Sequence, residues 1–138
     1  MFLLVMQLLL VSPPTLPNTH LTPGAVLPVT TTQICVPGYS KTVRNVPSGL
    51  KKLVFSTYAI RPSKDFEVDH LISLELGGSN DRTNLWPESY ITQPWNAHTK
   101  DALENHLHGL VCSGAISLQT AQTAIRTDWI AAYKQYLK

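Results

Sequence analysis

The sequence predicts an α+β fold, with a small core in which a β-hairpin packs on a helix, followed by a C-terminal helix. Apolar residues alternate along 66–76 as they do in a strand, and Gly77-Gly78 ends that run with a turn signal. Two later stretches place apolar residues at helical spacing, the first through Leu103, Leu107, Leu110 and Val111 and the second through Leu118, Ala121, Ile125, Trp129 and Tyr133. We therefore expect one helix from Trp95 or Asn96 to about Cys112, and a second, capped by Ser117, to about Tyr136.

The composition suits one domain with a modest core, since the chain has 138 residues, of which 43% are hydrophobic and 14% charged. These values exclude a coiled coil and a chain that is disordered throughout. The charge is unevenly distributed: charged residues before Asp65 are all basic, and all but one of the nine acids lie from Asp65 to Glu104. This pattern suits a protein that holds a polyanion on one surface and a metal cation on another, and solubility alone explains it equally well.

The N-terminal third predicts two segments that precede the folded domain. Residues 1–11 form an uncharged apolar run that has the length of a signal-peptide core and is too short to span a bilayer. Because the run lacks a basic start and a clear cleavage site, a disordered apolar start is the alternative. We expect export, secreted or periplasmic, with a cytoplasmic location as the alternative. Residues 12–33 are rich in Pro and Thr and predict an extended linker, so the domain would span 34–138.

The two cysteines, Cys35 and Cys112, stand near the two ends of the expected domain. They are too few for a structural zinc site and form no C-x-x-C pair. If the protein is exported, a disulfide between them would stabilise the fold by constraining the unfolded chain. Two buried free thiols are the alternative.

Two further elements are expected between the linker and the hairpin. Residues 33–44 suggest two short strands broken at Pro37-Gly38, and 50–58 suggest a short helix because their apolar residues recur at helical spacing. Residues 61–65 form the loop that leads into the hairpin.

The residues with chemical potential gather on the boundaries of the hairpin. Asp69 and His70 are adjacent in the first strand, and Asn84 lies where the polar loop 79–83 closes. Neighbours in a strand face opposite sides, so Asp69 and His70 share a site only if the strand ends or bends there. A lone Asp-His pair is commonly a surface or capping pair, and a lone Asn a turn residue. Their combination favours an active site.

The order Asp69-His70, then Asn84, then a helix that opens with Asn96 and His98 resembles the HNH endonucleases, which have a ββα-metal fold. The resemblance is strongest from Glu67 to Asn84. It is closest to the HNN variant of the family, in which Asn replaces the last His of the motif, without a zinc ribbon. It implies that His70 is a general base, that Asn84 braces the loop, and that Asp69 binds a metal ion together with a residue of the helix.

The chemistry of phosphodiester hydrolysis supports these roles. The reaction needs a base for the attacking water and a cation for the charge that develops on the phosphate. A histidine, with an ordinary pKa of about 6.5, accepts a proton at neutral pH, and a carboxylate such as Asp69 is a ligand that Mg²⁺ or Mn²⁺ prefers. The predicted function is a metal-dependent endonuclease that hydrolyses DNA.

The third site residue is open between Asn96 and His98. A separation of two residues turns a side chain by roughly 200° around a helix, so only one of them can face Asp69. We favour Asn96, which shares a helical edge with Lys100. Asn96 would suit Mg²⁺ or Mn²⁺, whereas His98 would favour Zn²⁺ or Ni²⁺. Glutamates 67, 75 and 88 either assist the metal or are solvated.

The expected partner is nucleic acid, held by phosphate contacts that carry no base information. The candidate contacts are Lys51, Lys52, Arg61, Lys64 and Lys100. The residues do not separate DNA from RNA, and we assume a monomer with no small-molecule cofactor. The alternatives are a catalytically inactive DNA-binding domain of the same fold and a disulfide-tied interaction domain.

Overall fold

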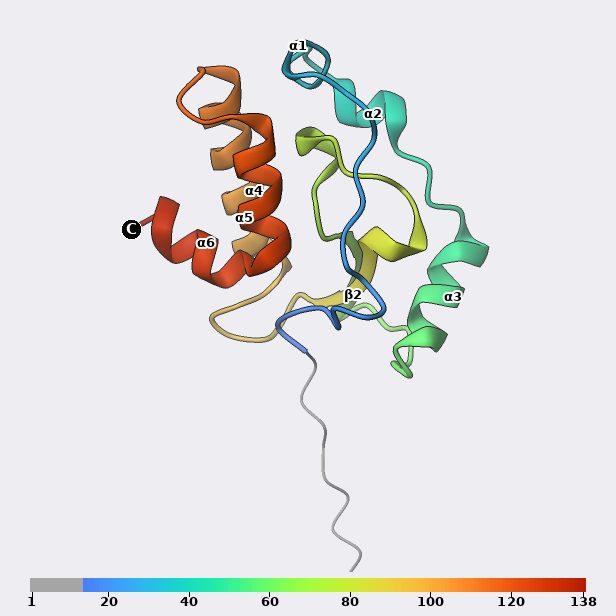
Figure 1. The fold of residues 1–138 in the computed structure, drawn as a ribbon. Helices are drawn as coiled ribbons and strands as arrows, with labels where there is room; N and C mark the ends of the chain where they lie inside the picture. The colour runs from blue at the N-terminus through green and yellow to red at the C-terminus, as the bar shows by residue number, and fades with distance from the viewer. Residues whose placement is uncertain (1–13) are drawn as a thin grey trace, which may run out of the picture.

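A computed structural model describes residues 14–138 and confirms the α+β class. The signal-peptide expectation for residues 1–11 lies outside the described part of the chain. The elements in order are α1 (Thr31–Ile34), α2 (Tyr39–Val43), α3 (Ser48–Thr57), β1 (Phe66–His70), the 3₁₀ turns η1 (Leu74–Leu76) and η2 (Arg82–Asn84), β2 (Leu85–Ser89), α4 (Ala97–Cys112), α5 (Leu118–Thr127) and α6 (Trp129–Tyr136). Figure 1 shows α3 on one side of the strands and α4, α5 and α6 on the other.

The two strands form an antiparallel hairpin whose register runs from Phe66 opposite Ser89 to His70 opposite Leu85. The first strand ends at His70, earlier than the apolar alternation suggested, because 74–76 close a 3₁₀ turn instead of extending the strand. Gly78 makes this turn possible, since a Cβ there would lie 1.7 Å from the carbonyl oxygen of Ile72. The chain therefore folds back sharply after His70.

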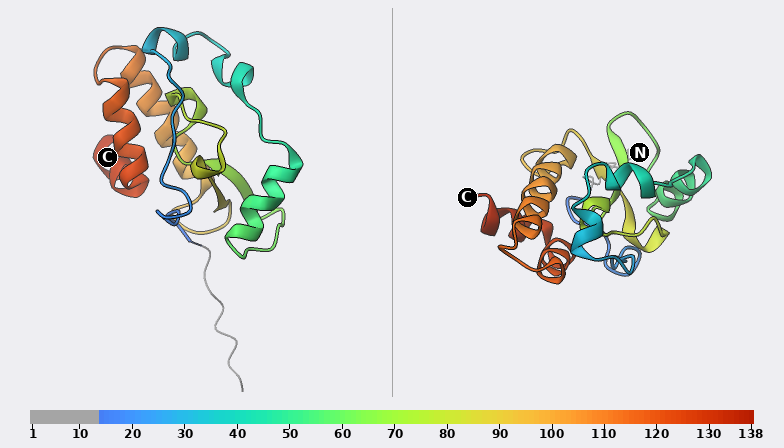
Figure 2. Two further views of the ribbon diagram at one scale, coloured as in Figure 1. Left: turned by 45° about the vertical axis from the view of Figure 1, so that its right-hand side comes forward. Right: turned by 90° about the horizontal axis from the view of Figure 1, so that it is seen from above.

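The two faces of the hairpin meet different helices (Figures 1 and 2). Helix α3, which confirms the predicted short helix, packs on one face through the edge-to-face pair of Phe55 and Phe66, with ring centroids 6.4 Å apart. Helix α4 reaches the other face through Lys100, which contacts Asp69. Alternate residues of β1 thus serve the two sides of the sheet.

The C-terminal part confirms the first predicted helix and divides the second. Helix α4 begins after Asn96 as expected. The predicted single helix from 118 to 136 is two helices, because Asp128 has an extended backbone (φ −164°) and its side chain accepts the amide N–H of Ala131 to cap α6. The core that joins α4, α5 and α6 includes Leu103, Leu107, Val111, Ile125 and Trp129.

Residues 14–30 do not form the expected linker but run across the domain as a strap, drawn in blue in Figure 1. The strap is held by hydrogen bonds from the Thr22 hydroxyl to the Leu85 carbonyl (2.9 Å) and from the Gly24 amide to the Thr83 carbonyl (2.9 Å). Near its start, the Trp129 indole donates to the carbonyl of Thr15 (2.9 Å). The folded unit therefore begins before Ile34, because backbone groups of the hairpin loop find their partners in the strap.

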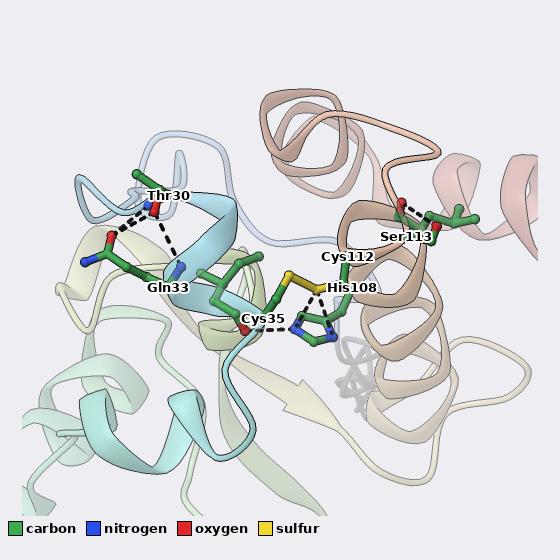
Figure 3. The surroundings of a disulfide bond; sticks show 8 residues. Thr30, Gln33, Cys35, His108, Cys112 and Ser113 are labelled. Carbon is green, nitrogen blue, oxygen red and sulfur yellow. Dashed lines mark hydrogen bonds between the residues drawn. A yellow bond between two sulfur atoms is a disulfide. The ribbon is translucent and has the colours of Figure 1, made fainter.

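The segment 33–44 contains two short helices and not the two strands expected. Thr30 and Gln33 form a reciprocal capping box that starts α1, and Gly38, with φ 83°, separates α1 from α2. Cys35, the C-cap residue of α1, forms a disulfide with Cys112 at the end of α4, with the Cα atoms 5.8 Å apart (Figure 3). This confirms the disulfide and excludes two free thiols.

Among residues 14–138, no helix is both long and apolar enough to cross a bilayer.

Candidate active site

The end of β1 opens into a polar cleft of about 240 Å³. Asp69 and His70 both line it, because the strand stops at His70 and the next residues turn away. The other polar residues that line the cleft are Ser40, Arg44, Glu67, Ser73, Glu75, Asp101 and Glu104. The condition set by strand geometry, that the strand must end for these neighbours to share a site, is met.

The His70 ring is held in one orientation by Asn80. Its Nε2 lies 3.0 Å from Asn80 Oδ1, which also accepts the amide N–H of Asn45, while Asn80 Nδ2 donates to the carbonyl of Val43 (2.7 Å). Because Oδ1 can only accept, Nε2 carries the proton of the neutral ring and Nδ1 keeps its lone pair. Nδ1 has no hydrogen-bond partner among residues 14–138. Burial lowers the pKa of His70, which favours this neutral form near neutral pH.

Asn84 braces the loop between the strands and does not line the cleft. Its fully buried amide donates to the carbonyls of Ile72 (2.9 Å) and Ser79 (2.8 Å), and its Oδ1 accepts the N–H groups of Ile72 (3.0 Å) and Ala25 (3.3 Å). These contacts fix the chain that leaves His70. Asn84 is therefore a positioning residue, in keeping with the bracing role that the resemblance implied.

Neither candidate for the third site residue reaches the cleft. The Asn96 side chain caps α4, accepting the Thr99 amide N–H (3.1 Å) and donating to the Thr92 carbonyl (2.9 Å), so both ends of its amide are occupied. His98 is exposed and lies against the Tyr90 ring, with centroids 5.3 Å apart. The expectation that one of them faces Asp69 is corrected: the residue of α4 that faces Asp69 is Lys100.

Lys100 is fully buried and is not available as the phosphate contact that we expected. Its Nζ lies 2.7 Å from Asp69 Oδ2 and 2.8 Å from the His70 carbonyl oxygen, and it also pairs with Glu104 one turn along α4. Burial alone would lower the pKa of Lys100, but the surrounding carboxylates raise it above its ordinary value. The ammonium is thus a permanent internal cation that ties α4 to the end of β1.

Carboxylates outnumber this cation on the same face of the hairpin. Glu67, Asp69 and Glu88 bring ligand oxygens within 4.8 Å of one another. Glu88 is 2% exposed, and neither of its carboxylate oxygens has a hydrogen-bond partner in the described part of the chain. Burial and then the charge of Asp69 raise the pKa of Glu88 well above its usual range. These carboxylate oxygens fit a hard divalent cation. The predicted ligand pair of Asp69 with Asn96 or His98 does not form, because neither of those side chains lies beside Asp69.

The exposed basic residues expected to contact phosphates lie beside the hairpin. Lys51 and Lys52 are on α3, and Arg61 and Lys64 are in the loop that joins α3 to β1. All four side chains are exposed. They remain candidates for binding a nucleic acid backbone.

Two residues of the site were missed by the sequence reasoning. Arg44 lines the cleft together with His70, and only its place in the basic N-terminal half could have suggested it. Asn80 lies in the polar loop, and its place two residues after Gly78 was a signal that its amide could turn back toward His70. Both come near His70 through the fold and not through the chain, so spacing alone could not reveal them.

Comparisons with known proteins add no assignment, since no protein-family model, no curated protein and no solved structure matches the chain. The geometry of the cleft therefore carries the functional assignment.

Proposed function

We propose that this chain is a metal-dependent endonuclease of the HNH type, with a ββα-metal core, that hydrolyses phosphodiester bonds of DNA with His70 as general base. The observation that carries the proposal is the His70 ring, which Asn80 fixes through Nε2 while Nδ1 is left without a partner in a polar cleft. A buried neutral histidine held in this way is suited to take a proton from water.

The residues of the cleft have different roles in the proposed hydrolysis. His70 takes a proton from the attacking water at Nδ1, and Asn80 Oδ1 stabilises the imidazolium by accepting its Nε2–H. Arg44, exposed and in the same cleft, offers a guanidinium that holds a phosphate oxygen. A positioned general base contributes roughly 10²- to 10⁴-fold in rate.

The divalent ion of this proposal would be held by Asp69, whose second carboxylate oxygen is not used by Lys100. When bound, such an ion stabilises the charge that develops on the phosphate and on the leaving oxygen. Because the carboxylate of Asp69 is a hard oxygen ligand and His98 lies outside the cleft, Mg²⁺ or Mn²⁺ is favoured over Zn²⁺ or Ni²⁺.

DNA is the proposed partner because exposed basic residues flank the hairpin and can neutralise a phosphate backbone. Lys51, Lys52, Arg61 and Lys64 offer charges but no groups that read bases, so cleavage would have weak sequence preference. An exported location, secreted or periplasmic, is proposed with it, supported by the Cys35–Cys112 disulfide, since disulfides persist in oxidising compartments.

The test is incubation of supercoiled plasmid with the full chain in the presence of Mg²⁺, Mn²⁺ or a chelator, with a structured RNA in parallel. We expect nicking of the plasmid with either metal and none with the chelator. Failure of the pure protein to nick the plasmid under any metal would contradict the proposal. Cleavage of the RNA alone would support phosphodiester hydrolysis and would contradict DNA as the substrate.

A DNA-binding domain without catalysis is the second candidate, and the Lys100–Asp69 ion pair is the observation that favours it. The ammonium already neutralises one oxygen of Asp69, as expected of a site that needs no metal ion. This candidate predicts that the protein retards DNA in a salt-sensitive manner and does not nick it with any metal.

A further inference from the structure

We infer that Glu67, Asp69 and Glu88 form a divalent-cation site on the hairpin itself, to which α4 contributes no ligand. The catalytic use of such an ion rests on the proposed endonuclease function, but its binding does not. The ligand type is three carboxylates, which suits Mn²⁺, Mg²⁺ or Ca²⁺.

The strand register places the three carboxylates on one face. Glu67 and Glu88 are directly opposite each other in the antiparallel pair, and Asp69 follows Glu67 by two residues. Like charges directly opposite each other destabilise a hairpin, and here a third carboxylate is added on the same face. A cation between them turns this repulsion into a set of ligands.

Glu88 is the observation that points to a ligand. Its side chain is almost completely buried, neither of its oxygens accepts a hydrogen bond from residues 14–138, and the carboxylates of Glu67 and Asp69 lie beside it. A buried polar group without a partner is costly and is rare in folded proteins. A bound cation would satisfy the oxygens of Glu88 where no protein donor does.

Lys100 cannot supply this missing partner. The acceptors that its Nζ contacts are Asp69 Oδ2, Glu104 and the His70 carbonyl. None of these contacts reaches Glu88, so the ammonium leaves both Glu88 oxygens without a partner. A divalent cation would supply that partner.

The neighbouring contacts orient the ligands and leave oxygens free. The Tyr90 hydroxyl donates to Glu67 Oε2 (2.6 Å), and Lys100 holds Asp69 by Oδ2 (2.7 Å). Within the described part of the chain, Glu67 Oε1 and Asp69 Oδ1 make no hydrogen bond. Glu67 and Asp69 thus each have one carboxylate oxygen fixed by a neighbouring residue and one oxygen free. Metal ligands are commonly oriented in this way by contacts with the residues around them.

The test measures Mn²⁺ binding directly, by loss of the electron paramagnetic resonance signal of free Mn²⁺, and follows thermal unfolding of the same samples. Wild type is expected to bind Mn²⁺ and to melt at a higher temperature as Mn²⁺ is added. Glu88→Gln keeps the side-chain volume and removes a carboxylate ligand, so it is expected to fold and to bind Mn²⁺ at least about ten-fold more weakly than wild type. Glu75→Gln, at a half-buried carboxylate of the same cleft outside the trio, is the matched control and keeps wild-type binding.

Wild type that leaves the Mn²⁺ signal unchanged, or Glu88→Gln that binds as well as wild type, would overturn the inference. If Glu88→Gln does not fold, Glu67→Gln decides by the same comparison. Plasmid nicking by the same preparations separates the two claims. Mn²⁺ binding without nicking contradicts the endonuclease and supports the site, whereas nicking by a wild type that binds no Mn²⁺ overturns the site alone.

Discussion

At the scale of single residues, the properties of His70 come from what surrounds its ring. Asn80 decides which nitrogen carries the proton, and burial decides how readily the ring takes up a second one. Asn80 is ten residues from His70 in the chain. The tautomer with an unprotonated Nδ1 is therefore built by the loop that returns after Gly77-Gly78.

The pKa of His70 sets the acidic limb of the expected pH profile. Burial lowers this pKa below its ordinary value of 6.5, and a general base is active only when neutral, so activity should be lost as pH falls through a value below 6.5. The hydrogen bond to Asn80 raises the pKa, so Asn80→Ala should move the limb to still lower pH and slow the reaction. The measurement is kcat/KM for plasmid nicking against pH for both proteins. A wild-type limb above 6.5 would contradict this account of the ring.

At the scale of elements, the loop between β1 and β2 is held by one amide. Asn84 satisfies four backbone groups, three of them in the turn that carries the chain away from His70. The cleft therefore depends on Asn84 although that residue does not touch it.

Asn84→Asp should destabilise the protein, because Asp keeps the acceptor and loses both N–H groups that bind the carbonyls of Ile72 and Ser79. Leaving buried carbonyls without a donor and burying a carboxylate should lower the free energy of unfolding by about 3 kcal/mol, as measured by urea denaturation. Asn105→Asp, at an exposed position of α4, is the control and should change it little. Equal stability of Asn84→Asp and wild type would show that the cross-link is not needed.

The elements that the sequence predicted well are those with local signals. The helix after Asn96 has a cap and an apolar stripe, and the turn at Gly77-Gly78 needs glycine. The strap of 14–30 could not be predicted, because its sequence has no helical or strand periodicity. It is held in place by hydrogen bonds to a loop that is distant in the chain. The break at Asp128 was missed because the apolar stripe continues across it.

The site was predictable only where its residues are neighbours in the chain. Asp69 and His70 stand together in the sequence, and strand geometry correctly required the strand to end there. Lys100 was predicted to contact phosphates, and the carboxylates that face it explain why it is buried instead. The sequence could not show which residue of the helix meets Asp69, since that depends on how α4 sits on the hairpin.

At the scale of the whole molecule, the disulfide joins the first helix to the end of α4 (Figure 3). His108 reinforces the same junction, since its Nε2 donates to the carbonyl of Ile34 (3.0 Å). The small sheet alone gives little stability, so a link between distant parts of the chain has a large effect.

Reduction of the disulfide should lower the free energy of unfolding by about 4 kcal/mol, because the Cys35–Cys112 link closes a loop with a sequence separation of 77 and so restricts the unfolded chain. Urea denaturation with and without a reductant measures the difference. The double variant Cys35→Ser with Cys112→Ser is the control, and its stability should not respond to the reductant. If wild type does not respond either, the link contributes nothing to stability.

The central claim is that His70 is the base of a phosphodiester hydrolase. The most direct measurement is the single-turnover rate of plasmid nicking, at equal protein and Mn²⁺, for wild type, His70→Ala and the exposed control His20→Ala. The account predicts that His70→Ala is slower than wild type by roughly 10²- to 10⁴-fold and that His20→Ala is unchanged. Equal rates for wild type and His70→Ala, or no nicking by wild type, would contradict it.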